Sequence, residues 1–180
     1  SNDGQWLVAN SCGCYSECGS ESVWHLPTLS QISSPLSFPI GGMDFSPDSS
    51  QLVLGQWQMF GYQESALYTA SSDLSSPTSI YNRSETAPIR QEWSPDGTMI
   101  AFTLVEIDPL EMSATERMVI LTSPNGNEQL LVESGGAEFL AWSPDSSKIL
   151  YTQEVGGVRN VFVYDRVSET KTLLPFTIDA

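Results

Sequence analysis

The feature that most constrains the fold of this chain is a turn motif that recurs at nearly constant spacing. It occurs as Phe45-Ser46-Pro47-Asp48, as Trp93-Ser94-Pro95-Asp96 and as Trp142-Ser143-Pro144-Asp145. The motif serines are 48 and then 49 residues apart, and a weaker copy, Ser1-Asn2-Asp3-Gly4, precedes Ser46 by 45 residues. The sequence therefore predicts four repeats in a single domain, with approximate boundaries at 1–45, 46–93, 94–142 and 143–180.

Each motif has the composition of a tight turn. Proline presets φ at the second position, aspartate accepts hydrogen bonds from nearby backbone amides, and glycine or serine follows. Because Asp48, Asp96 and Asp145 recur at equivalent positions, we interpret them as structural turn residues and not as catalysts. A short apolar run rich in β-forming residues follows each turn, which is typical of a strand buried on both faces.

Four strands fit into each repeat. One precedes the motif (43–45, 91–93 and 140–142) and the buried one follows it. Two more are expected at 21–26 and 31–36, at 65–70 and 78–81, at 117–122 and 129–132, and at 160–164 and 171–174. Helical spacing of apolar residues is absent, and four strands in about 45 residues is the pattern of a propeller blade. The predicted fold class is all-β, a β-propeller of four-stranded antiparallel blades with four repeats in this chain.

The ten residues from Trp93 to Phe102, WSPDGTMIAF, carry a resemblance to a known family. They resemble the TolB-type, WD-like β-propeller repeat, and the resemblance extends over all four repeats. It implies an extracytoplasmic location, whether periplasmic, envelope-associated or secreted. It does not imply one activity, because propellers host many unrelated functions.

Four blades are the lower limit of propeller architecture. The ring is therefore completed in one of three ways: by further blades of a longer protein, by self-association or another chain, or by the four blades alone. In the phase of the repeat, residues 178–180 correspond to the strand that precedes a motif. Closure would let them supply the inner strand of the first blade.

Charge restricts the classes of partner. The chain has 22 Asp and Glu against 7 Lys and Arg, a net charge of −15. Such a chain repels nucleic-acid backbones and anionic lipid surfaces, which argues against both as partners. It also has no apolar run of the length that a transmembrane helix needs. Cations, basic proteins and neutral ligands remain as partners.

Three cysteines, Cys12, Cys14 and Cys18, lie within seven residues of one predicted loop. With His25 as a fourth ligand they could hold a metal, but their spacing matches no common zinc pattern. A disulfide, such as Cys12 with Cys18, and free thiols are the alternatives. We prefer the disulfide, which would indicate an oxidising compartment, and we predict neither a metal site nor a cofactor.

A second predicted loop, residues 56–63, is unusually aromatic. It carries Trp57, Phe60 and Tyr62, and aromatic side chains are enriched at binding surfaces, where they offer large contact areas. We therefore predict that these three residues contact a partner. The alternative is that Trp57 and Phe60 pack between blades.

A third predicted loop, residues 105–116, is acidic. Glu106, Asp108 and Glu111 are candidate partner-binding residues. Their oxygens could also bind calcium, although the spacing is not that of an EF-hand loop. The alternative is an acidic loop that is simply solvated.

Catalytic patterns are scarce. His25 is the only histidine, and the sequence has neither a G-x-S-x-G elbow nor a glycine-rich phosphate loop. We therefore expect no enzyme but a propeller scaffold that binds a protein or peptide partner through rim loops. The alternatives are the propeller portion of a larger peptidase-like enzyme, with its catalytic domain outside this chain, and a carbohydrate-binding propeller that uses the aromatic loop.

Overall fold

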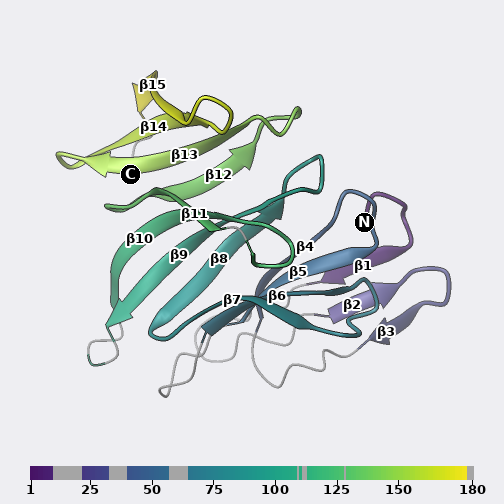
Figure 1. The fold of residues 1–180 in the computed structure, drawn as a ribbon. Helices are drawn as coiled ribbons and strands as arrows, with labels where there is room; N and C mark the ends of the chain where they lie inside the picture. The colour runs from purple at the N-terminus through teal and green to yellow at the C-terminus, as the bar shows by residue number, and fades with distance from the viewer. Residues whose placement is uncertain are drawn as a thin grey trace.

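The structure is a computed structural model that describes residues 1–9, 22–32, 40–56, 65–108, 110, 113–127 and 129–177. Every regular element in these ranges is a β-strand, and the strands form four antiparallel sheets (Figure 1). Within the same ranges, no helix has the length and apolar character needed to cross a membrane. The all-β fold class predicted from the repeat is confirmed.

Consecutive strands pair within each sheet, in chain order. The first sheet contains β1 (Trp6–Ala9), β2 (Ser22–His25) and β3 (Ser30–Ile32). The second contains β4 (Ile40–Phe45), β5 (Gln51–Gln56), β6 (Ser65–Ser71) and β7 (Thr78–Arg83). The third contains β8 (Thr86–Trp93), β9 (Ile100–Asp108), β10 (Ser113–Thr122) and β11 (Gln129–Glu133). The fourth contains β12 (Glu138–Trp142), β13 (Lys148–Val155), β14 (Val158–Asp165) and β15 (Thr170–Thr177).

The three clear motif copies connect the first strand of a sheet to its second strand. Several strands are longer than the apolar pattern indicates. The strand predicted at 117–122, for example, begins at Ser113, because residues that precede the apolar run already pair with β9. Of the strand predicted at 31–36, the part described lies within β3, and residues 33–36 are outside the described ranges.

The core lies between neighbouring sheets. Val23 of the first sheet packs in one cluster with Leu52 and Leu54 of the second. A second cluster joins residues of the second and third sheets, among them Val53, Leu67, Phe102 and Leu104. A third joins residues of the third and fourth sheets, among them Val119, Phe139, Ile149 and Tyr151. Each sheet thus buries apolar side chains against the next one, and Figure 1 shows the sheets following one another in an arc.

The motif turns share one set of contacts, illustrated by the third sheet. The Ser94 hydroxyl donates to Asp96 Oδ1 at 2.6 Å, and Asp96 Oδ1 accepts the Thr98 N–H at 3.0 Å. Gly97 has a φ of 71°, the left-handed region that a turn of this kind requires. The same serine-to-aspartate bond occurs at Ser46–Asp48, Ser143–Asp145 and Ser1–Asp3. The weak first copy of the motif therefore forms the same turn.

Neighbouring motif turns are also bonded to each other. The Asp96 N–H donates to the Ser146 hydroxyl at 2.9 Å, which links the third and fourth sheets. The Asp3 N–H donates to the Ser49 hydroxyl at 3.2 Å, which links the first turn to the second sheet. At this rim, hydrogen bonds therefore link the first sheet to the second and the third sheet to the fourth.

Candidate functional site

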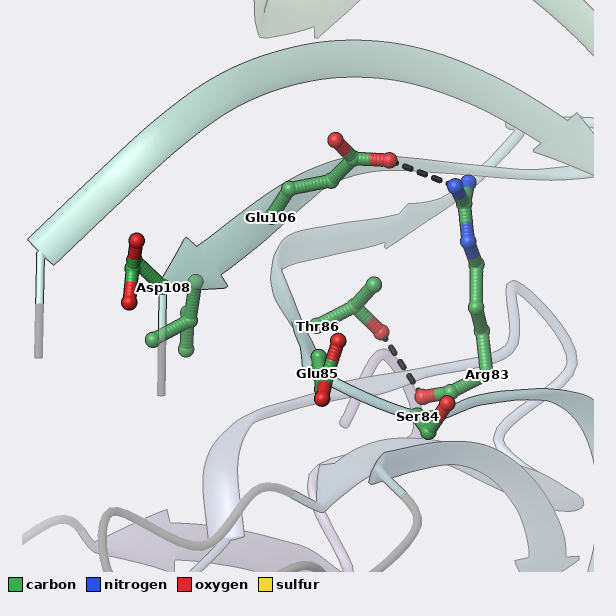
Figure 2. A pocket seen from close by; sticks show the side chains of 7 residues that line it. Arg83, Ser84, Glu85, Thr86, Glu106 and Asp108 are labelled. Atoms are coloured by element: carbon green, nitrogen blue, oxygen red, sulfur yellow. Dashed lines mark hydrogen bonds and ion pairs between the residues drawn. The ribbon is translucent and has the colours of Figure 1, made fainter. Parts of the chain in front are cut away.

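A recess lies at the rim opposite the motif turns, between the second and third sheets. Its volume is about 450 Å³. Because the strands alternate in direction, the β7–β8 turn and the β9–β10 hairpin reach this same rim. Seven residues line the recess: Arg83, Ser84, Glu85, Thr86, Glu106, Ile107 and Asp108 (Figure 2).

The β7–β8 turn is fixed to the end of β9 by backbone contacts. The Glu85 carbonyl accepts the Ile107 N–H at 2.9 Å, and the Thr86 hydroxyl donates to the Arg83 carbonyl at 2.9 Å. Glu85 has a φ of 56°, so the chain reverses sharply at this residue. Residues from two sheets therefore meet in a defined arrangement at the recess.

The side chains of the recess are predominantly acidic. Arg83 forms an ion pair with Glu106, and these side chains are 46% and 33% exposed. Figure 2 shows Glu85 and Asp108 to one side of this pair. Asp108 Oδ1 also accepts the Leu110 N–H at 2.7 Å. Three carboxylates against one guanidinium give the recess a net negative charge, which suits a basic group or a hydrogen-bond donor.

Two further carboxyl groups, those of Asp44 and Glu92, lie on the first strands of the second and third sheets. Asp44 of β4 accepts the Trp93 N–H at 2.8 Å. Burial raises the pKa of Asp44, and burial together with the charge of Asp44 raises the pKa of Glu92 on β8. Among the residues that the structure describes, no group of three or more His, Cys, Asp or Glu side chains is arranged to hold a metal ion.

The predicted loop at 105–116 is wrong at both ends, because residues 105–108 belong to β9 and residues 113–116 to β10, where strand pairing continues past the apolar runs. Two of the predicted partner-binding residues, Glu106 and Asp108, nevertheless lie together in the lining of the recess. His25 lies in the first sheet, where its ring packs 4.7 Å from that of Trp6 and its Nδ1 lies 2.8 Å from the Thr28 hydroxyl. The other predicted binding and cysteine residues lie outside the described ranges: Cys12, Cys14, Cys18, Trp57, Phe60, Tyr62 and Glu111.

The sequence did not single out Arg83 or the turn at Ser84 and Glu85. These residues belong to a different repeat from Glu106, and the pairing of β8 with β9, in which Thr86 lies opposite Glu106, brings them together. One signal was available, because Arg83 is the first Lys or Arg of a strongly acidic chain. A cation in such a chain is a reasonable place to look for a carboxylate partner.

No protein-family model matches this chain, and no curated protein matches it. Solved structures do. A TolB-type protein from Agrobacterium tumefaciens aligns over 100% of this chain and 60% of its own, with 18% identity and a TM-score of 0.68. TolB from Acinetobacter baumannii aligns over 98% and 43%, with 15% identity and a TM-score of 0.69. A chain of a nidogen/laminin complex aligns over 93% and 60%, with 12% identity and a TM-score of 0.62.

The chain thus spans about three fifths of the Agrobacterium protein and less of the Acinetobacter one. At these identities the likeness concerns the fold. The four sheets, the motif turns between first and second strands and these similarities agree. The chain therefore has the fold of a TolB-like β-propeller.

Proposed function

We propose that this chain is a non-enzymatic propeller scaffold that binds a protein or peptide partner at the rim opposite the motif turns. The observation that carries the proposal is the acidic recess, whose lining holds three carboxylates, Glu85, Glu106 and Asp108, and a single cation, Arg83, paired with Glu106. A lysine or arginine side chain of the partner fits this recess. Part of the recess is the turn at Ser84 and Glu85, and connections on a rigid scaffold are common places for such contacts.

The ion pair between Arg83 and Glu106 is weak enough for a partner's basic group to replace Arg83. An ion pair as exposed as Arg83–Glu106 contributes about 1 kcal/mol or less to stability. A basic group of the partner can therefore take the place of Arg83 beside Glu106 at small cost. The net charge of −15 also accelerates the approach of a basic partner.

Two further points support the proposal. The single histidine, His25, lies in the first sheet and not at the recess, so imidazole acid–base chemistry has no group there. The similar chain from the nidogen/laminin complex belongs to an assembly of proteins. The resemblance of this chain to TolB-type repeats supports an extracytoplasmic location for it.

Site-specific photo-crosslinking in cells of the source organism tests the proposal. A benzophenone amino acid at Ser84, in the recess, should give a discrete crosslinked product. The same amino acid at Thr98, in a motif turn at the opposite rim, should not. Equal products at both positions, or none at Ser84, would contradict binding at this rim.

Charge variants test whether the carboxylates of the recess are responsible for the Ser84 crosslink. Glu85→Gln with Glu106→Gln should abolish the Ser84 crosslink, because it removes two of the three carboxylates of the recess. Glu154→Gln with Glu169→Gln removes the same charge from exposed positions outside the recess and should leave the crosslink intact. A loss with both pairs would indicate a general effect of net charge.

A further inference from the structure

A second charged cluster lies between the third and fourth sheets. At its centre is Glu138, the first residue of β12, whose side chain is only 9% exposed. Arg90 of β8 places Nε 2.9 Å from Glu138 Oε1. Arg117 of β10 and Arg159 of β14 place a guanidinium nitrogen 3.7 and 3.6 Å from Glu138 Oε2. Four strands of two stacked sheets (Figure 1) thus direct charged groups to one point.

The cluster lies at the same rim as the recess. Glu138 begins β12, Arg159 is the second residue of β14, and Arg117 follows the β9–β10 hairpin. The starts of β12 and β14 lie opposite the motif turns, which join the other ends of β12 and β13, whereas Arg117 and Arg90 are each the fifth residue of their strand. The cluster is nevertheless a separate site, since it is formed by another pair of sheets.

The cluster concentrates positive charge in an acidic protein. It contains three of the seven Lys and Arg residues of the chain. Glu138 balances one of them, and Glu154 stands opposite Arg159 in the β13–β14 register, where it can balance another. Positive charge remains in excess even after both carboxylates are counted, against a molecular net charge of −15.

Two of the guanidinium groups are held loosely. A guanidinium has five N–H donors, and a hydrogen bond to a carboxylate is about 2.7–3.2 Å long. The Arg90 contact meets this limit, whereas the contacts of Arg117 and Arg159 are longer. The side chains of Arg117 and Arg159 are also 39% and 36% exposed. They are thus positioned by Glu138 and accessible from solvent.

We propose that Arg117 and Arg159 form a binding site for a carboxylate group of a peptide, with Glu138 and Arg90 as positioning residues. Guanidinium groups bind planar carboxylates through paired hydrogen bonds. A monoanion suits the site, because the three arginines leave one positive charge in excess after Glu138 and Glu154 are counted, and a phosphate dianion exceeds that charge. This inference does not depend on the acidic recess, which selects the opposite charge.

The arginine side-chain N–H signals of the full chain provide the test. Its Nε–H resonances are followed by NMR during titration with N-acetyl-trialanine, which has a free C-terminal carboxylate. N-acetyl-trialanine amide serves as the uncharged control, and N-acetylglutamate amide presents a side-chain carboxylate. We expect saturable shifts of Arg117 and Arg159 with either acid and none with the amide. Equal shifts with acid and amide, or no saturation with either acid, would overturn the proposal.

Substitutions locate the site. Arg117→Gln and Arg159→Gln should each weaken binding of the acid about tenfold, the equivalent of one lost charge-assisted hydrogen bond. Lys148→Gln removes the same charge at the motif rim and should change the affinity less than about twofold, the size of a screened surface effect. Arg159→Lys keeps the charge but loses the paired N–H donors of the guanidinium, so its affinity for the acid should resemble that of Arg159→Gln. The Arg159→Lys variant also provides the test if Arg159→Gln does not fold. An equal loss in Lys148→Gln would show non-specific attraction.

Discussion

The Asp44 carboxylate on β4 accepts the backbone N–H of Trp93 on β8 at 2.8 Å, across 49 residues of sequence. This bond joins the first strand of the second sheet to the first strand of the third sheet. It also places a half-buried carboxylate near Glu92. The pKa values of Asp44 and Glu92 are both raised. The joint between the second and third sheets is therefore sensitive to charge.

Replacement of Asp44 separates its hydrogen bond from its charge. Asp44→Ala leaves the Trp93 N–H without its acceptor and should lower the free energy of unfolding by about 1–3 kcal/mol. Asp44→Asn keeps an acceptor oxygen and should cost clearly less. Urea unfolding at pH 7 measures both. Equal losses for the two variants would mean that the hydrogen bond is not what stabilises this joint.

The pKa of Glu92 reports the proximity of Asp44. Burial raises this pKa first and the Asp44 charge adds to it, so Asp44→Asn should lower it while burial keeps it above the ordinary value. Raised carboxyl pKa values mean that stability present in acid is lost as the pH rises through them. As the pH rises from about 4 to 7, the difference in stability between Asp44→Asn and wild type should therefore shift in favour of the variant. NMR titration of the Glu92 carboxyl carbon gives the pKa directly, and an unchanged value would refute the coupling.

The motif turns should have the opposite pH dependence. The Ser143 hydroxyl, followed by the amide and hydroxyl of Ser147, lowers the pKa of Asp145 from 3.8 to about 2. A lowered pKa contributes stability above the ordinary value that is lost as the pH falls through the folded one. Asp145→Asn should thus reduce the loss of stability between about pH 4 and pH 2. Urea midpoints at several pH values in this window provide the measurement, and an unchanged slope would contradict it.

The two turn glycines Gly126 and Gly97 should differ in their tolerance of alanine. Both have a positive φ, 73° and 71°, which costs an alanine about 1 kcal/mol. A Cβ at Gly126 would also lie 2.5 Å from the Ile80 carbonyl oxygen of β7, whereas at Gly97 its nearest neighbour is Pro47 Cδ at 3.6 Å. Gly126→Ala should therefore be the more destabilising by about 1–3 kcal/mol. Thermal unfolding of both variants tests this order, and equal losses would mean that β7 moves away at little cost.

Glu138 should matter more for stability than a comparable surface carboxylate. Glu138→Gln leaves Arg90, Arg117 and Arg159 close together without their shared anion, and should cost about 1–3 kcal/mol. Glu133, paired with Lys171 at 2.9 Å and more exposed, is the matched control. Its replacement by Gln should cost about 1 kcal/mol or less. If the two variants unfold alike in urea, Glu138 does not organise the cluster.

The sequence was sufficient for the fold because the information is local and repeated. A serine, a proline and an aspartate define each turn, and the apolar run after the turn defines a buried strand. Strand ends were less predictable, because β10 begins at Ser113, four residues before the strand that the apolar pattern predicts. There, pairing with β9 decides the length.

The charged sites were predictable only in part. Glu106 and Asp108 were recognised because they lie close together in one acidic stretch. Their partner Arg83 comes from another sheet. The contacts of Glu138 were not predictable at all, because they involve four strands whose relative positions depend on register and sheet packing. Ion pairs between residues that are far apart in the sequence can be identified only from a three-dimensional structure.

The bonds between neighbouring motif turns have a mechanical consequence. Asp96 with Ser146, and Asp3 with Ser49, tie adjacent sheets at the rim of the motif turns. The third and fourth sheets are tied again toward the opposite rim, because the Ala137 N–H donates to the Arg117 carbonyl at 3.0 Å and Glu138 contacts both Arg117 and Arg159. A joint fastened at two places resists rotation of one sheet against the other. The spacing of Arg117 and Arg159 is therefore built into the scaffold before any ligand arrives.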